Sequence, residues 1–136
     1  MKKLLKGPFS YSGNKYRIYS KYLHSVMGRF ERIHEPFLGS GVCMYNSLKG
    51  GNGTDIEPSV IALHQSLKRK DIHKEVKEAY NRFFPNGRNK NDYNNLRIAF
   101  NESYLLNGFN DENIILFHVL IQLGFNSLIR FGPNGF

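Results

Sequence analysis

Glu35, Gly39, Gly41 and Asp55 are the residues of this 136-residue sequence whose types and spacing best fit a binding chemistry. The two glycines stand in the stretch EPFLGSGVCM, where an extended segment is expected to turn into a helix. Such a turn exposes main-chain N–H groups, and an acidic residue about 20 positions later can accept hydrogen bonds from ribose hydroxyls. The pattern therefore predicts a nucleoside-binding turn.

This turn differs from the known phosphate-binding loops. Met44 takes the place of the third glycine of a dinucleotide fingerprint, and no Gly-Lys-Ser/Thr follows. A nucleoside without a pyrophosphate thus fits better than NAD or ATP. The open alternative is a purely structural glycine turn, with Asp55 capping the helix that begins at Pro58.

Alternating helices and strands are expected to position these residues. Helical spacing predicts a helix over residues 16–27, after a turn at Ser12-Gly13-Asn14. The following segments predict a strand, a short helix, a second strand and a helix starting at Pro58: 29–37, 42–48, 51–57 and 58 onward. This order is typical of an α/β fold with an open sheet.

Residues 1–68 are predicted to form this first domain, and residues 69–136 a mostly helical second one. Helices are expected over 71–84, over 93–104 and from 113, the last one almost wholly apolar and capped by Asn110 or Asp111. The final segment, NSLIRFGPNGF, alternates polar and apolar residues before Pro-Asn-Gly. It predicts the first strand of a β-hairpin and its turn.

Composition limits the class of protein. The formal net charge of +8 favours a polyanionic partner such as nucleic acid. No apolar run reaches the ~20 residues of a membrane-spanning helix, and no secretory signal follows the basic N-terminus. Cys43 is the single cysteine, which excludes an internal disulfide, and the five histidines have no metal-ligand spacing. A cytoplasmic protein without a metal site or a membrane partner is expected.

Three segments, taken in order, resemble the Dam family of DNA adenine-N6 methyltransferases: PFSYSGNKY at 8–16, EPFLGSG at 35–41 and TDIEP at 54–58. A fourth, GFNSLIR at 124–130, resembles the segment that opens the family's DNA-recognition hairpin. The resemblance covers nearly the whole chain. It implies an α/β fold: a partial Rossmann-like sheet that binds S-adenosyl-L-methionine, then a helical DNA-recognition region ending in a truncated β-hairpin.

The resemblance also implies the cofactor-binding residues. Lys15 would approach the methionine end of S-adenosyl-L-methionine, Glu35 its amino group, and Asp55 its ribose hydroxyls. Ile56 would pack on the adenine. Tyr11 either leans against a flipped target base or is a core tyrosine, and both alternatives are open. The full implied set is Tyr11, Ser12, Gly13, Asn14, Lys15, Glu35, Pro36, Phe37, Gly39, Ser40, Gly41, Asp55 and Ile56.

The implied partner is double-stranded DNA with a GATC-like target. Arg130 resembles the guanine-reading arginine of the family, and a guanidinium can bond both guanine acceptors in the major groove. A phosphate contact or a surface charge are open alternatives for Arg130. The other implied DNA-binding residues are Asn126, Ser127 and Leu128. Basic residues expected near phosphates are Lys68, Arg69, Lys70, Arg88 and Lys90.

The family's chemistry depends on an Asp/Asn-Pro-Pro-Tyr/Phe loop, and this sequence has no Pro-Pro pair. No catalytic residue is therefore expected in this chain. Three hypotheses are open: a truncated or split methyltransferase portion that is inactive alone, a catalytically inactive phage or mobile-element protein that binds DNA or a partner, and a basic helical DNA-binding module without cofactor. Because a partial sheet leaves an open edge, a second chain supplying the catalytic half, or self-association, is expected.

Overall fold

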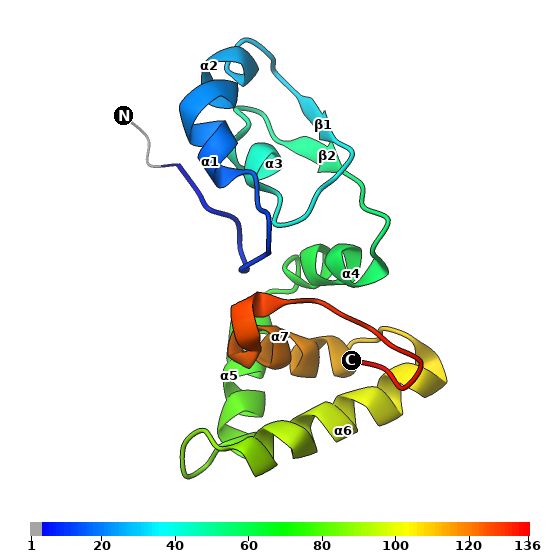
Figure 1. Ribbon diagram of the computed structural model, residues 1–136. Helices are drawn as coiled ribbons and strands as arrows, with labels where there is room; N and C mark the ends of the chain where they lie inside the picture. Colours follow the sequence, from blue (N-terminus) through cyan, green and yellow to red (C-terminus); the bar gives the residue numbers. More distant parts are fainter. Residues whose placement is uncertain (1–3) are drawn as a thin grey trace. The chain divides into compact units, whose positions relative to one another are not determined.

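The computed structural model of the protein describes residues 4–136, which form two compact units that divide between Ile61 and Ala62. We call them the N-terminal unit and the helical unit (Figure 1). The fold is mixed and rich in helix, with one small parallel sheet. The predicted domain boundary between residues 68 and 69 lies shortly after this division.

The N-terminal unit begins with a continuous helical segment of three parts. These are α1 (Tyr16–Ile18), the π-helix η1 (Tyr19–Leu23) and α2 (His24–Met27). The helix predicted over 16–27 is confirmed. Tyr19 is buried and forms a small core with Val42 and Cys43.

The two strands of this unit pair in parallel, which is consistent with the predicted α/β fold. β1 (Ile33–Glu35) pairs with β2 (Gly51–Gly53), and α3 (Val42–Asn46) connects them. Both strands are shorter than their predicted ranges. Close packing requires glycine at Gly51, because a Cβ there would lie 2.6 Å from the Ile33 carbonyl oxygen, a main-chain atom; a Cβ at Gly53 would lie 2.3 Å from the side-chain end of Leu38.

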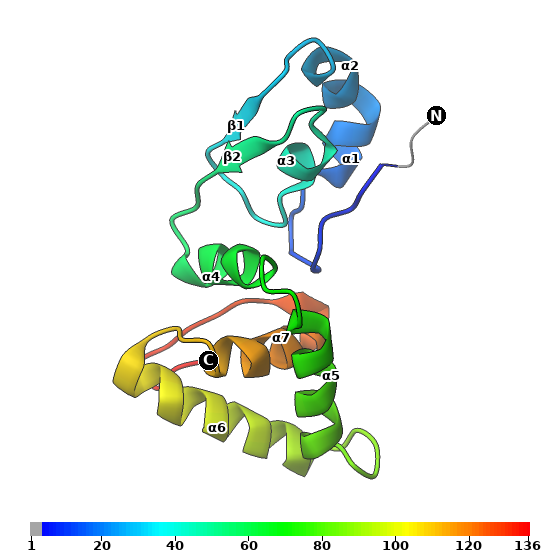
Figure 2. The same cartoon turned by 180° about the vertical axis from the view of Figure 1, so that it is seen from behind.

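Four helices follow: α4 (Pro58–Ser66), α5 (Ile72–Phe83), α6 (Lys90–Asn107) and α7 (Asn113–Leu123). The boundary between the two units falls within α4. Both α5 and α6 pack against α7, which is the buried centre of the helical unit as predicted (Figure 2). The predicted cap is also confirmed, since Asn110 Oδ1 accepts hydrogen bonds from the main-chain N–H groups of Glu112 (3.0 Å) and Asn113 (2.9 Å).

The chain after α7 differs from its prediction. A 3₁₀ turn, η2 (Phe125–Ser127), takes the place of the start of the predicted strand, because Asn126 and Ser127 adopt left-handed φ values of +51° and +50°. From Leu128 the chain is irregular. The predicted turn is present: an isolated antiparallel bridge joins Gly132 and Gly135 around Pro133-Asn134. The prediction of a strand here is wrong, because the described residues form no run of paired strand residues in this segment.

Candidate functional site

A pocket of about 350 Å³ lies beside the glycine turn of the N-terminal unit. Main-chain geometry shapes it: Gly39 and Gly41 have φ values of +48° and +69°, and Gly41 is the N-cap residue of α3. Glycine adopts this left-handed backbone without steric cost, so the chain can reverse direction between β1 and α3. The pocket is lined by Tyr11, Gly13, Asn14, Lys15, Glu35, Phe37, Leu38, Gly39, Ser40, Val42, Asp55 and Ile56.

Most of the predicted cofactor-binding residues line this pocket. Ser12, Pro36 and Gly41 do not line it, although each is next in sequence to residues that do. Leu38 and Val42 line the pocket and were not predicted. Both are buried, and their only sequence signal was an apolar side chain within the glycine-rich stretch, which equally indicates core packing.

Asp55 connects the glycine turn to the start of α4. Its Oδ2 accepts a hydrogen bond from Gly39 N at 2.9 Å, and its Oδ1 accepts one from Glu57 N at 3.0 Å. The second bond lies outside α4, and the cap of that helix is Glu57, whose Oε1 accepts from Ser59 N at 3.2 Å, not Asp55 as the structural alternative anticipated. Since a carboxylate has about four acceptor positions, Asp55 can also accept from ligand hydroxyls while it holds the turn.

Glu35 is buried and joined to Lys15. Its Oε1 lies 3.0 Å from Lys15 Nζ, and its Oε2 accepts from Met44 N at 3.0 Å. Lys15 Nζ also donates to the main-chain oxygen of Phe37. A buried carboxylate needs such partners to offset its lost hydration, so this ion pair fixes an ammonium group on the pocket wall.

Cys43 lies behind Glu35 in the core of this unit. Burial raises the pKa of its thiol to about 11, with a further contribution from the charge and hydrogen bond of Glu35. At neutral pH the thiol is therefore protonated and unreactive, because the thiolate is the nucleophile. Cys43 is a packing residue of this site.

Three further side chains give the pocket its character. Ser40 is buried, and its Oγ has no hydrogen-bond partner within the described residues, which suits a polar ligand atom. Phe37 and Ile56, by contrast, are apolar and exposed, with 75% and 96% of their surfaces accessible to solvent. Apolar side chains left open beside a pocket can cover the flat face of a bound aromatic ring.

Tyr11 packs against the glycine turn. A Cβ added at Gly39 would lie 3.1 Å from its ring, so glycine is needed there for space as well as for φ. Burial raises the pKa of the Tyr11 phenol, and the charges of Asp55 and Glu57 raise it further. The phenol is therefore protonated at neutral pH and can donate a hydrogen bond.

The predicted DNA-binding residues all lie after α7. Arg130 and Asn126 are exposed, Leu128 is 38% exposed, and Ser127 is partly buried. Arg69, predicted near phosphates, instead forms ion pairs with Glu75 (2.6 Å) and Asp111 (3.5 Å). The other predicted phosphate-binding residues are exposed: Lys68, Lys70, Arg88 and Lys90.

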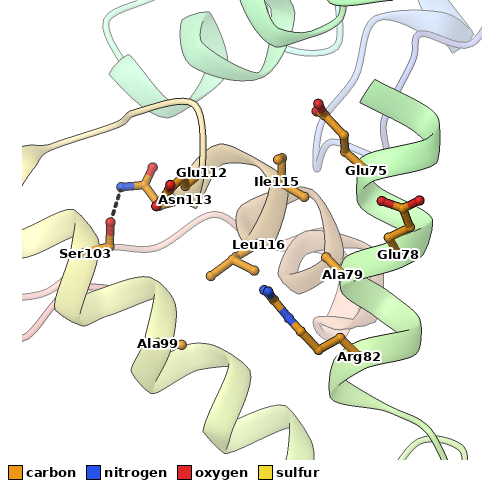
Figure 3. A pocket seen from close by; sticks show the side chains of 10 residues that line it. All are labelled: Glu75, Glu78, Ala79, Arg82, Ala99, Ser103, Glu112, Asn113, Ile115 and Leu116. Carbon is orange, nitrogen blue, oxygen red and sulfur yellow. Dashed lines mark hydrogen bonds between the residues drawn. The ribbon is translucent and has the colours of Figure 1, made fainter. Parts of the chain in front are cut away.

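A pocket of about 530 Å³ in the helical unit contains none of the predicted site residues. Figure 3 shows Arg82 and Leu116 pointing into the space between α5 and α6. Three carboxylates, those of Glu75, Glu78 and Glu112, stand around it. Because none of the predicted DNA-binding residues lines this pocket, it is not the expected DNA surface.

Within residues 4–136, no three His, Cys, Asp or Glu side chains come close enough together to hold a metal ion. None of the helices in that range has the length and apolarity needed to cross a membrane.

Comparison with known proteins gives the family. Residues 11–136 match the family model of the D12 class N6 adenine-specific DNA methyltransferases, so the match includes both the pocket of the N-terminal unit and the exposed Arg130. A search of the curated proteins found no significant match. Because the family model covers almost the whole sequence, the chain belongs to the D12 class of N6 adenine-specific DNA methyltransferases.

Proposed function

We propose that the pocket of the N-terminal unit binds S-adenosyl-L-methionine and that the chain takes part in site-specific methylation of adenine N6 in duplex DNA. One observation carries the proposal: Asp55, the Lys15–Glu35 pair and the glycine turn surround a single pocket. In this proposal β1 and β2, which α3 connects, are the first strands of a Rossmann-like sheet.

The chain's own residues fit this ligand in three ways. Asp55 has acceptor positions for the ribose hydroxyls, and Lys15 offers a positive charge to the ligand carboxylate. Phe37 and Ile56 are open to cover the adenine. S-adenosyl-L-methionine supplies an electrophilic methyl group when bound. A ligand ammonium would share Glu35 Oε1 with Lys15, since that oxygen already has an ionic partner.

In the DNA-recognition part of the proposal, Arg130 reads a guanine of a GATC-like site. Its exposure beside a closed turn supports this role, because a guanidinium must reach the groove edge free of other partners to bond both guanine acceptors. Asn126, Ser127 and Leu128 would lie along the same face of the DNA. The target duplex implies the cytoplasm of a bacterial or phage-infected cell as the site of action.

These 136 residues contain no Pro-Pro pair, and hence no loop of the type that holds the target adenine in this family. We therefore expect them to bind cofactor and DNA but to need the loop from another polypeptide segment. A second chain, or self-association covering the sheet edge, fits this need. The second candidate, favoured by the same absence, is a family member that binds DNA without transferring a methyl group.

Isothermal titration with S-adenosyl-L-methionine and with its demethylated product tests the cofactor proposal. Binding to the wild type is expected, and Asp55→Asn should weaken it about ten- to hundredfold, because a charge-assisted hydrogen bond to the ribose is lost. Asp71→Asn makes the same chemical change at an exposed site of the helical unit and should bind like the wild type.

Two outcomes would reject the cofactor proposal: no binding heat with the folded wild type, or equal affinity of Asp55→Asn and Asp71→Asn. Transfer of a radiolabelled methyl group to unmethylated duplex DNA separates the two candidate functions. If the chain is part of a split enzyme, adding a segment with the catalytic loop should start methyl transfer to the DNA. If it is an inactive binding protein, no methyl transfer should be seen after this addition.

A further inference from the structure

Asn101 is a half-buried residue of α6. Its side chain forms two hydrogen bonds with the main chain of Phe136, in the C-terminal segment. Its Oδ1 accepts from Phe136 N at 2.7 Å, and its Nδ2 donates to the main-chain oxygen of Phe136 at 3.1 Å. A side-chain amide has one acceptor and one donor group, so it satisfies both main-chain groups as a neighbouring strand would. Asn101 thus takes the place of a partner strand.

Gly135 allows this approach. A Cβ at Gly135 would lie 2.4 Å from Asn101 Oδ1, and its φ of +88° also favours glycine. Gly135 in turn exchanges two main-chain hydrogen bonds with Gly132, with N···O distances of 2.9 Å and 3.1 Å. The tip of the segment is therefore closed on itself and attached to α6 through Asn101.

Two aromatic rings anchor the same segment from inside. The Phe131 ring centroid lies 4.9 Å from that of Tyr104 on α6, and the Phe136 centroid lies 5.2 Å from that of Phe117 on α7. In Figure 1 the C-terminal segment, in red, returns along these helices. Arg130 directly precedes the inward-facing Phe131 and is exposed, so the anchored segment presents Arg130 to solvent.

We infer that Asn101 is a positioning residue for DNA reading, because it holds residues 128–136 in the conformation that presents Arg130. This inference rests on the proposed role of Arg130. A bidentate bond to guanine needs a fixed guanidinium, and a segment already held in place loses less conformational entropy on binding. A phosphate contact tolerates movement, so loss of Asn101 should affect the preferred sequence and leave non-specific binding nearly unchanged.

The test compares binding of two duplexes, one with a GATC site and one with that site scrambled, by fluorescence anisotropy. For the wild type we expect tighter binding of the GATC duplex. Asn101→Ala should reduce this preference about tenfold, the size of one good base contact, and change affinity for the scrambled duplex less than about twofold. Amide hydrogen exchange at Phe136 should speed up in the same variant.

Three companion variants make the result decisive. Gly135→Ala acts on the same contact from the other side and should lower the preference in the same way, whereas Gly87→Ala, at a glycine with open space in the α5–α6 loop, should keep it. Circular dichroism restricts the comparison to folded variants. Arg130→Ala should remove the preference altogether.

The outcomes separate the two ideas. If Arg130→Ala loses the preference while folded Asn101→Ala and Gly135→Ala keep it, the positioning role of Asn101 is rejected and the reading role of Arg130 stands. If Arg130→Ala binds both duplexes as the wild type does, the proposed reading role itself fails. Faster exchange at Phe136 with an unchanged preference would also reject the inference, because the contact would then be structural only.

Discussion

At the scale of single residues, the two acidic residues of the pocket differ in their surroundings. Glu35 is buried and held by Lys15 and the main chain, whereas Asp55 is only partly buried and keeps acceptor positions open to the pocket. Glu35 is the last residue of β1, whereas Asp55 lies two residues after the end of β2. Their different burial therefore decides that Glu35 organises the site and that Asp55 is available to a ligand.

His118 predicts a pH dependence of stability. Burial lowers the pKa of its imidazole to about 4, with a smaller contribution from His73, and its Nε2 lies 2.7 Å from Ser66 Oγ. The unfolded chain has the ordinary pKa of about 6.5, so between the two values the unfolded state binds the extra proton. The stability contribution is complete above about pH 6.5 and is lost as the pH falls toward 4.

Urea unfolding from pH 7.5 to 4.0 measures this effect. His118→Asn should flatten the dependence of unfolding free energy on pH across that window, while His34→Asn, an exposed histidine of the N-terminal unit, should leave it as in the wild type. Equal pH dependence in the wild type and His118→Asn would show that His118 is not the group responsible.

At the scale of elements, the short parallel sheet depends on a strand with glycine at two of its three positions, Gly51 and Gly53. Gly51→Ala should weaken the pairing of β1 and β2, since its Cβ would meet the Ile33 carbonyl oxygen, a main-chain atom that cannot move away. Overpacking of this kind costs about 1–3 kcal/mol, measured by thermal or urea unfolding. Gly132→Ala, with open space around the glycine, serves as the control; equal stability of the two variants would contradict the account.

The C-terminal segment shows where element prediction from sequence failed. In the structure the Phe131 ring packs on Tyr104 and Arg130 is exposed, but the polar-apolar alternation did not lead to a strand here. Alternation does not show whether a partner strand exists, and here Asn101, from a helix, supplies the main-chain partners at the end of the segment. A hydrogen bond between residues 35 positions apart leaves no local pattern in the sequence.

At the scale of the whole molecule, positive charge extends over both units, since Lys and Arg outnumber Asp and Glu in each. Binding to duplex DNA should therefore weaken as salt rises, because phosphate contacts release counterions. The Arg88→Gln, Lys90→Gln double variant should reduce the slope of log K against log salt by about 2, one for each lost phosphate contact.

Arg69→Gln is the matched control for this measurement. Its guanidinium already pairs with Glu75 and Asp111, so the variant should leave the salt slope unchanged. Filter binding or anisotropy from 50 to 300 mM salt, in which ~1 unit of slope corresponds to one contact, provides the readout. If the double variant keeps the wild-type slope, Arg88 and Lys90 do not contact phosphates.

The sequence by itself determined the order of helices and strands as far as α7, the glycine turn, the family, and most residues around the pocket, because each rests on local backbone preferences or on short motifs. Tertiary structure decided what these residues do to one another. It places Glu35 in an ion pair with Lys15, Arg69 in an ion pair with Glu75, and Asn101 in hydrogen bonds with Phe136. Such partnerships depend on burial and on contacts between distant segments, which residue spacing along the chain does not encode.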